Sequence, residues 1–361
     1  MNGHPPTRII AEAGVNHNGE LAVALEMVDI AAECGCDAIK FQTFKADRLV
    51  TRETPKAPYQ TLYDSTPSQF EMLKALELSA EQHAAIFDRC ITKGIDFLST
   101  PFDIQSLQYL VETFDMSEIK ISSGDLTNAP LLLEAARTQR PIILSTGMAT
   151  LEDIAKALQV LSVGYTSPQA SPSAELDDLP VSLPQNFTAL NDKVTILHCV
   201  TQYPTPLEDA GLDSILVLKE AFGVPVGYSD HTTSTILPAV SVALGAILVE
   251  KHFTFDKKSH GPDHASSLEP DELLQMVAYI RDVEKTMTDR GKIPTVGELA
   301  NIDCARKSLT ASKPIQVGDV FTADNVTVKR PGTGISPFRY WDVIGRPSPK
   351  SYDIDETIDE V

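Results

Sequence analysis

Eight short runs of apolar and β-branched residues recur between Arg8 and Lys285, and a longer amphipathic stretch follows each of them. The runs are RIIAEAG, DAIKFQT, DFLST, EIKIS, PIILS, VTILHCV, VPVGYS and AILVEKHF. Because they are apolar on both faces, they are typical of parallel strands that are covered on both sides. Eight such strand–helix units predict an α/β fold of the (β/α)₈ or TIM-barrel type. An open doubly wound sheet gives a similar alternation and stays an alternative.

The amphipathic stretches carry helix start and stop signals. Ser79 and Thr150 stand at positions suited to N-caps, and Gly223 follows a stretch that it would end. Two segments exceed what the strand–helix units need, and we interpret residues 44–78 and 162–192 as insertions, the second as a surface loop. The predicted helices cover residues 21–34, 80–93, 151–161, 207–222 and 272–286.

The character of the chain changes after Lys285. Residues 289–302 are polar and contain Gly and Pro, which indicates a linker. The later runs SLTASKPI, DVFT, NVTVKR and DVIG are short and β-like. We therefore predict a barrel domain over residues 1–287, a linker over 288–304 and a small β-rich domain over 305–361.

Charge and composition exclude several classes of protein. The formal net charge of −20 repels phosphate backbones, so nucleic acid is not expected as a partner. No apolar run approaches the roughly 20 residues that span a bilayer, and the N-terminus carries no apolar signal core. The scattered cysteines indicate free thiols, and the protein is expected in a reducing cytoplasm. These cysteines are Cys34, Cys36, Cys90, Cys199 and Cys304.

Polar residues follow every one of the eight predicted strands at its carboxyl end. In a barrel these ends converge on one face, where active sites form. One polar strand end is ordinary, but eight together are hard to explain by packing. The residues are Glu12, Lys40, Gln42, Thr100, Lys120, Ser123, Asp125, Ser145, Tyr203, Ser229, Asp230, His231 and His252.

Two histidines end neighbouring strands and could share one metal ion. His231 and His252 follow strands seven and eight, with Glu12 on strand one beside them. Neutral imidazoles bind divalent transition metals and can leave positions open for water and substrate. The alternative is a pair of hydrogen-bonded core histidines.

Two lysines face the same predicted barrel mouth. Lys40 and Lys120 would be costly to bury unless an anion or a carboxylate accompanies them. Phosphate suits such point charges, and Ser123, Ser145 and Ser229 could add hydroxyl donors. Ion pairing with Glu12 or Asp125 and a Schiff-base lysine are the alternatives.

Taken together, these strings resemble the sialic acid synthase family in the same order. The matching strings are IIAEAGVNHNG, KFQTFKA, FLSTPFD, KISSG, PIILSTGM, ILHCVTQYPTP, VGYSDHT, EKHFT and GPDH. The segment VKRPGTGIS is similar to that family's C-terminal SAF, or antifreeze-like, domain, which is a small β-clip fold. The resemblance covers almost the whole chain and implies a barrel followed by a SAF domain.

The resemblance implies a reaction and a set of roles. The family condenses phosphoenolpyruvate with an N-acyl hexosamine and water to give a nonulosonic (sialic) acid and phosphate. It uses Mn²⁺ or a similar divalent ion, with Mg²⁺ or Co²⁺ as alternatives. By match of motif, His231 and His252 resemble the metal ligands, and Glu12 resembles the acidic residue beside metal and aldehyde. The matched phosphoenolpyruvate contacts are Lys40, Lys120, Ser123, Ser145 and Ser229.

Further matches concern the sugar and the assembly. Gln42, Tyr203, Asp230 and Asp263 resemble residues on the sugar side of the family's site. Arg330 resembles the SAF-domain arginine that reaches into the partner subunit's barrel, which implies a domain-swapped homodimer.

Two departures from the family pattern concern the sugar. Asp125 stands where the family commonly has Glu, and Thr201 or Gln202 stands where Asn or Glu is frequent. The resemblance implies N-acetylmannosamine as the substrate. A 2,4-diacetamido-2,4,6-trideoxyhexose, which would give legionaminic or pseudaminic acid, is the alternative. A non-catalytic sugar-binding protein is the alternative from another class.

Overall fold

The computed structural model describes residues 5–169, 187–287 and 291–361. The chain divides into two compact units, Met1–Thr288 and Asp289–Val361. No helix within the described ranges is long and apolar enough to cross a membrane.

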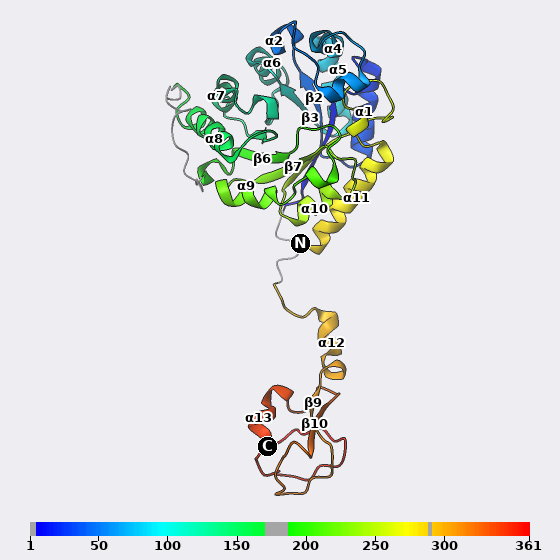
Figure 1. The fold of residues 1–361 in the computed structure, drawn as a ribbon, viewed down its shortest axis with the longest axis vertical. Helices are drawn as coiled ribbons and strands as arrows, with labels where there is room; N and C mark the ends of the chain where they lie inside the picture. The colour runs from blue at the N-terminus through cyan, green and yellow to red at the C-terminus, as the bar shows by residue number, and fades with distance from the viewer. Residues whose placement is uncertain (1–4, 170–186, 288–290) are drawn as a thin grey trace. The chain divides into compact units, whose positions relative to one another are not determined.

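The first unit is built on eight parallel strands that form a barrel (Figure 1). Their spatial order is β3-β2-β1-β8-β7-β6-β5-β4, and β3 and β4 lie side by side to close the barrel. This order confirms the predicted (β/α)₈ barrel and removes the doubly wound alternative. The strands are β1 (Arg8–Gly14), β2 (Ala38–Thr43), β3 (Asp96–Pro101), β4 (Ile119–Ile121), β5 (Ile142–Ser145), β6 (Val194–Cys199), β7 (Val226–Asp230) and β8 (Leu248–His252).

Helices surround the barrel, as Figure 1 shows. Ser79 caps α5 through a hydrogen bond from the Gln82 amide (3.2 Å), as its position in the sequence predicts. The prediction of one helix over 207–222 is wrong, because Gly211 takes a left-handed conformation between η3 (Leu207–Asp209) and α9. The helices are α1 (Leu21–Glu33), α5 (Ala80–Lys93), α6 (Ile104–Phe114), α7 (Ala129–Arg137), α8 (Leu151–Thr166), α9 (Ser214–Phe222), α10 (Leu237–Ala243) and α11 (Pro270–Thr286).

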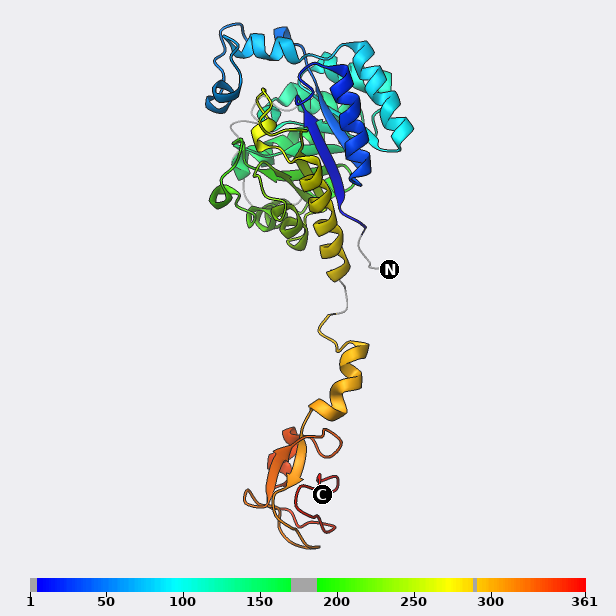
Figure 2. The same ribbon diagram turned by 90° about the vertical axis from the view of Figure 1, so that its right-hand side faces the viewer.

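The first predicted insertion folds into three short helices, α2 (Ala46–Leu49), α3 (Pro58–Tyr63) and α4 (Gln69–Leu76). Figure 2 shows this segment at the end of the barrel where the strands finish. The second insertion was predicted as a loop over 162–192, yet α8 continues through Thr166 and η2 spans Thr188–Leu190. Residues 170–186 of that prediction lie outside the described residues.

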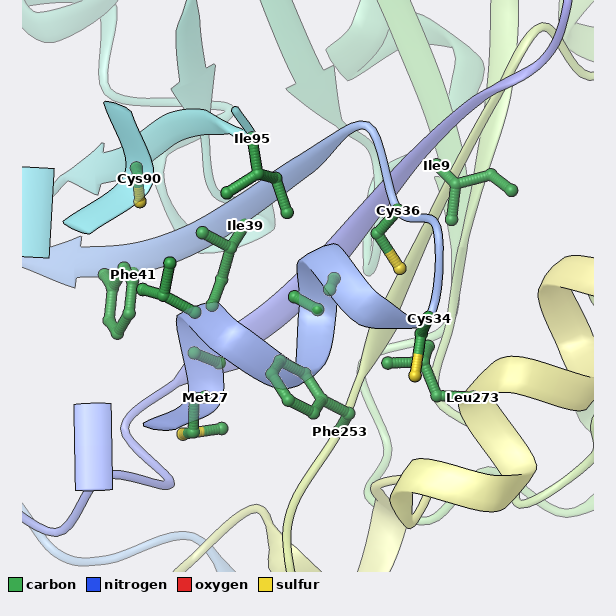
Figure 3. Close-up of a cluster of buried hydrophobic side chains, with 14 of the residues drawn as sticks. Ile9, Met27, Cys34, Cys36, Ile39, Phe41, Cys90, Ile95, Phe253 and Leu273 are labelled. Carbon is green, nitrogen blue, oxygen red and sulfur yellow. The ribbon is translucent and has the colours of Figure 1, made fainter. Parts of the chain in front are cut away.

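Two apolar clusters of the first unit lie on opposite sides of the barrel wall. Between the sheet and α1, α5 and α11, apolar side chains pack densely, and Cys34, Cys36 and Cys90 are free thiols among them (Figure 3). Burial raises the pKa of Cys90 to about 12, so this thiol stays protonated. Inside the barrel, one apolar layer closes the bottom; its members are Ile10, Ala38, Leu98, Ile143, Leu197 and Leu248.

The second unit has a small core of its own around Leu309, Phe321 and Tyr352. Its sheet pairs β9 (Ser308–Ala311) with β10 (Val326–Lys329) in antiparallel fashion. Two predictions are corrected here. The second half of the predicted linker folds into α12 (Val296–Ala305), which begins with a capping box between Thr295 and Glu298. The run DVIG is not a strand, since its start belongs to α13 (Tyr340–Val343).

Candidate active site at the carboxyl ends of the barrel strands

A polar layer lies directly above the apolar layer that closes the barrel. Side chains of a strand alternate between its two faces, so the residue two positions after an inward residue also points inward. Each strand contributes one residue to this polar layer, and all of them line the same pocket. They are Glu12, Lys40, Thr100, Lys120, Ser145, Cys199, Ser229 and Glu250.

The pocket above this layer is a cavity of about 360 Å³. Its lining also includes Gln42 near the carboxyl end of β2, and Ser123, Tyr203 and Asp263 from segments that follow the strands. One side is apolar and comes mainly from the inserted segment; we call it the apolar wall. It consists of Val15, Leu49, Val50, Met72, Leu73, Leu76 and Phe102. The pocket therefore joins a charged floor to a wall suited to methyl groups.

Four buried charges form the floor. Lys40 Nζ lies 2.5 Å from Glu12 Oε2 and donates to Thr100 Oγ1 at 3.1 Å. Glu250 lies between the lysines, with Oε2 3.6 Å from Lys40 Nζ and Oε1 3.5 Å from Lys120 Nζ. Two carboxylates thus balance two ammonium groups, which makes the burial of all four tolerable. The ion pair weighed as an alternative for Lys40 does exist, with Glu12 as its partner.

Burial and mutual charge shift the pKa values of these groups in opposite directions. Burial, reinforced by Glu250, outweighs Lys40 and raises the pKa of Glu12 to about 7. Burial opposes ionisation of Glu250, yet Lys120 and Lys40 lower its pKa to about 2. The two carboxylates overcome the burial of Lys40 and raise its pKa, whereas burial lowers the pKa of Lys120. A Schiff base on Lys40 would need a neutral amine, which this environment disfavours.

The two predicted metal ligands lie side by side at the pocket. The ring centroids of His231 and His252 are 5.5 Å apart. Burial lowers the pKa of His231 to about 4 and that of His252 well below its usual value, so both imidazoles are neutral. His231 Nδ1 lies 2.6 Å from the Val200 carbonyl; since a carbonyl can only accept, Nε2 of His231 is the nitrogen without a proton.

The chemistry of these side chains fits a divalent ion. Among the described residues, His252 Nδ1 is buried without a hydrogen-bond partner. A cage of three or more His, Cys, Asp or Glu side chains does not occur in the part of the chain that the structure describes. An ion on His231 and His252 would therefore take further ligands from water and substrate, as catalytic sites do.

Gly14 allows three of the predicted residues to converge. It takes a left-handed φ of 52° at the register shift between Glu12 and Gly14. A β-carbon there would lie 3.2 Å from His252 Cε1 and 3.4 Å from both Asp263 Oδ2 and Glu12 Oε1. A side chain at this position would be strained and would crowd the site.

The structure brings most of the predicted site residues of the first unit into this one pocket, but Asp230 and Asp125 do not line it. Asp230 points to the other face of β7, where it pairs with buried Lys251 (2.6 Å) and accepts from the Tyr228 hydroxyl (3.0 Å). Asp125 is outside the pocket lining and accepts hydrogen bonds from Ser122 Oγ (2.7 Å) and Asn128 Nδ2 (3.0 Å). The geometry thus gives Asp230 and Asp125 structural partners. Arg330 belongs to the second unit.

Sequence reasoning missed Glu250 and the apolar wall, and it named Thr201 only as one of two possible departures from the family pattern. Glu250 stands two residues before His252 on β8 and therefore shares its inward face, a signal that the alternation rule could have supplied. Thr201 lines the pocket after β6. The apolar wall had no such signal, because it comes mainly from short helices of the insertion, to which the alternation of side chains along a strand does not apply.

The barrel mouth combines two lysines, two carboxylates and two neutral histidines, a set of side chains suited to binding a small anion. In comparison with known families, residues 27–292 match the NeuB family and residues 306–358 match the SAF domain. The chain belongs to the NeuB family, which confirms the resemblance seen in its motifs.

The relatives of this chain are named as synthases of different sugar acids. The chain is 42% identical to N,N'-diacetyllegionaminic acid synthase from Campylobacter jejuni, over 98% of this chain and 99% of that protein. It is 32% identical to a pseudaminic acid synthase from the same species, over 98% and 95%. The crystal structure of N-acetylneuraminic acid synthetase from Leptospira borgpetersenii is 30% identical, with a TM-score of 0.67 over 82% of this chain and 90% of that chain.

Proposed function

We propose that this protein condenses phosphoenolpyruvate with an N-acylated amino sugar and water, giving a nonulosonic acid and phosphate. The observation that carries the proposal is the floor of the pocket, where Lys40 and Lys120 face the cavity beside hydroxyl groups of Ser145 and Ser229. Ammonium and hydroxyl donors in a buried pocket suit a small, multiply charged anion. Membership of the NeuB family supports the same reaction.

For the sugar, we propose a 2,4-diacetamido-2,4,6-trideoxyhexose, giving a legionaminic-type acid. The N-acetylmannosamine that the resemblance implied is not confirmed, and the 42% identity to a diacetyllegionaminic acid synthase supports the alternative. The apolar wall also supports it, because a 6-deoxy methyl and a second acetyl methyl would lie well against aliphatic side chains. Gln60 and Gln69, which also line the pocket, could bind an acetamido group.

The residues divide the chemistry between them. Carbon 3 of phosphoenolpyruvate attacks the open-chain aldehyde of the sugar, water adds at carbon 2, and phosphate leaves by cleavage of the C–O bond. Lys40 and Lys120 hold the anion so that the two carbons meet in reactive geometry. Glu12, whose pKa of about 7 lets it take or give a proton near neutrality, serves the water or the new hydroxyl. A divalent ion held by His231 and His252 would polarise the aldehyde as a Lewis acid.

Comparing sugars tests this proposal. With phosphoenolpyruvate and Mn²⁺, kcat/KM for the diacetamido-trideoxy sugar should exceed that for N-acetylmannosamine on the order of a hundredfold, because a methyl and an acetamido contact are gained. Phosphate release, measured continuously for each sugar, gives the ratio. A ratio near one or below it would contradict the assigned sugar, and no release with any sugar would contradict the reaction.

A polar substitution in the apolar wall should change sugar choice. Leu73 is half-buried on α4 and lines the pocket. Leu73→Asn should reduce the preference for the 6-deoxy sugar about tenfold, the expected effect of losing an apolar contact with a methyl group. Leu25→Asn, at a half-buried leucine on α1 that packs against the core outside the pocket, is the matched control and should leave the ratio of kcat/KM values unchanged. An unchanged ratio in Leu73→Asn would remove the apolar wall from the proposal.

We also propose a homodimer in which Arg330 of the SAF domain contacts the sugar bound in the partner subunit. The match of residues 306–358 to the SAF domain supports this assembly. Light scattering should report twice the mass of one chain, and a monomer at assay concentrations with full activity would contradict it.

A further inference from the structure

Glu250 is the charged residue of the pocket for which neither the sequence motifs nor the proposed chemistry supplies a role. Its side chain is 4% exposed and lies in the polar layer on β8. Ser229 Oγ donates to its Oε1 at 3.0 Å and fixes the carboxylate from the neighbouring strand β7. Glu250 is therefore anchored by the barrel itself, independently of any substrate.

The two lysines are held in different ways. Lys40 has a close partner in Glu12 at 2.5 Å and a hydrogen bond to Thr100. Within the described ranges, Glu250 is the one carboxylate in ion-pair distance of Lys120, and the 3.5 Å separation exceeds an ordinary hydrogen bond. Glu250 thus supplies counter-charge to Lys120 without occupying its N–H donors.

We propose that Glu250 is a positioning residue that holds Lys120 charged and aimed across the pocket for the phosphoenolpyruvate anion. The inference rests on the proposed function, in which Lys40 and Lys120 bind this anion. A buried ammonium needs a compensating charge, yet a carboxylate in direct contact would compete with the substrate for its donors. The longer Glu250–Lys120 separation meets both requirements, because Ser229 keeps the carboxylate from closing on the lysine.

A double-mutant cycle tests the inference directly. Binding of phosphoenolpyruvate would be measured by titration calorimetry, with Mn²⁺ and without sugar, for the wild type, Glu250→Gln, Lys120→Gln and the double variant. Glu250→Gln should weaken binding at least about tenfold, as expected when one partner of a buried charge pair is removed. In the Lys120→Gln background, the same change should alter affinity less than about twofold, since coupled residues are not additive.

Glu118→Gln is the matched control. Glu118 is also buried and paired with a cation, Arg8 at 2.6 Å, but it lies at the amino end of β4, outside the pocket. Its replacement should leave phosphoenolpyruvate affinity as in the wild type. If Glu250→Gln does not fold, Glu250→Asp keeps the charge and withdraws it by one methylene, and it should still weaken binding severalfold.

The other possible outcomes distinguish a wrong role for Glu250 from a wrong proposed function. Unchanged or tighter binding in Glu250→Gln, or unchanged binding in Glu250→Asp, would overturn the positioning role alone. An equal loss in the Lys120→Gln background would show that Glu250 acts independently of Lys120, and would also overturn it. A wild-type protein that binds no phosphoenolpyruvate would instead overturn the proposed function on which the inference rests.

Discussion

Replacing His252 with alanine should abolish phosphate release from phosphoenolpyruvate and the sugar. In the proposed chemistry, His231 and His252 are the two protein ligands of the ion that activates the aldehyde. Losing one imidazole leaves a single protein ligand, and Lewis-acid activation is worth several kcal/mol, so kcat should fall about a thousandfold or more. Initial rates at saturating substrates and Mn²⁺, together with the bound metal per chain by mass spectrometry, measure the effect. His231→Ala should behave in the same way.

His198→Ala is the control for a buried histidine that lies outside the pocket. His198 is on β6, where its ring stacks on Tyr228 and its Nε2 hydrogen-bonds the Ala210 carbonyl at 2.8 Å. Its replacement should lower the melting temperature but retain turnover. If His252→Ala keeps full activity, or if the wild type keeps full activity after dialysis against EDTA, the two histidines do not serve a catalytic metal.

Replacing Lys40 with glutamine should lower kcat/KM for phosphoenolpyruvate by about a hundredfold to a thousandfold, the range for removal of one preorganised charge-stabilising donor. Lys40 holds the anion in the proposed chemistry, and it lies between Glu12 and Glu250. Without it, Lys120 alone faces the two carboxylates, and the excess negative charge adds repulsion against an anionic substrate. Phosphate release at varied phosphoenolpyruvate and fixed sugar separates this loss from any change in the sugar KM.

Lys45→Gln controls for the loss of a lysine beside the same strand. Lys45 pairs with Glu77 at 3.1 Å, is partly exposed and does not line the pocket. Its kcat/KM should stay within about twofold of the wild type, because exposed ion pairs contribute little. A Lys40→Gln protein as active as Lys45→Gln would remove Lys40 from the anion site.

The barrel was predictable because its signal is local and repeated. Each strand is apolar on both faces, and cap residues such as Ser79 and Thr150 mark where helices begin. The predicted elements were wrong where one or two residues decided the local backbone conformation against the periodic pattern. Gly211 interrupts the predicted helix over 207–222, and the Thr295–Glu298 capping box makes a helix in the polar linker, where apolar periodicity gave no signal.

The site was predicted unevenly because sequence position locates a strand end but not the face to which a side chain points. Asp230 and Ser229 are neighbours in sequence, yet Ser229 enters the pocket and Asp230 pairs with Lys251 on the other face. Glu250 was missed although it shares the inward face of His252. The apolar wall depends on how α2 and α4 pack against each other, which no short motif encodes.

The fate of the oxygen that bridges carbon and phosphorus in phosphoenolpyruvate shows whether phosphate leaves by cleavage of the C–O bond. Phosphoenolpyruvate labelled with ¹⁸O at that position would be incubated with the protein, Mn²⁺ and the diacetamido-trideoxy sugar, and both products analysed by mass spectrometry. We expect the label to leave entirely with phosphate, the nonulosonic acid to be unlabelled, and phosphate to form only when sugar is present. Label in the sugar acid, or phosphate formed without sugar, would contradict it.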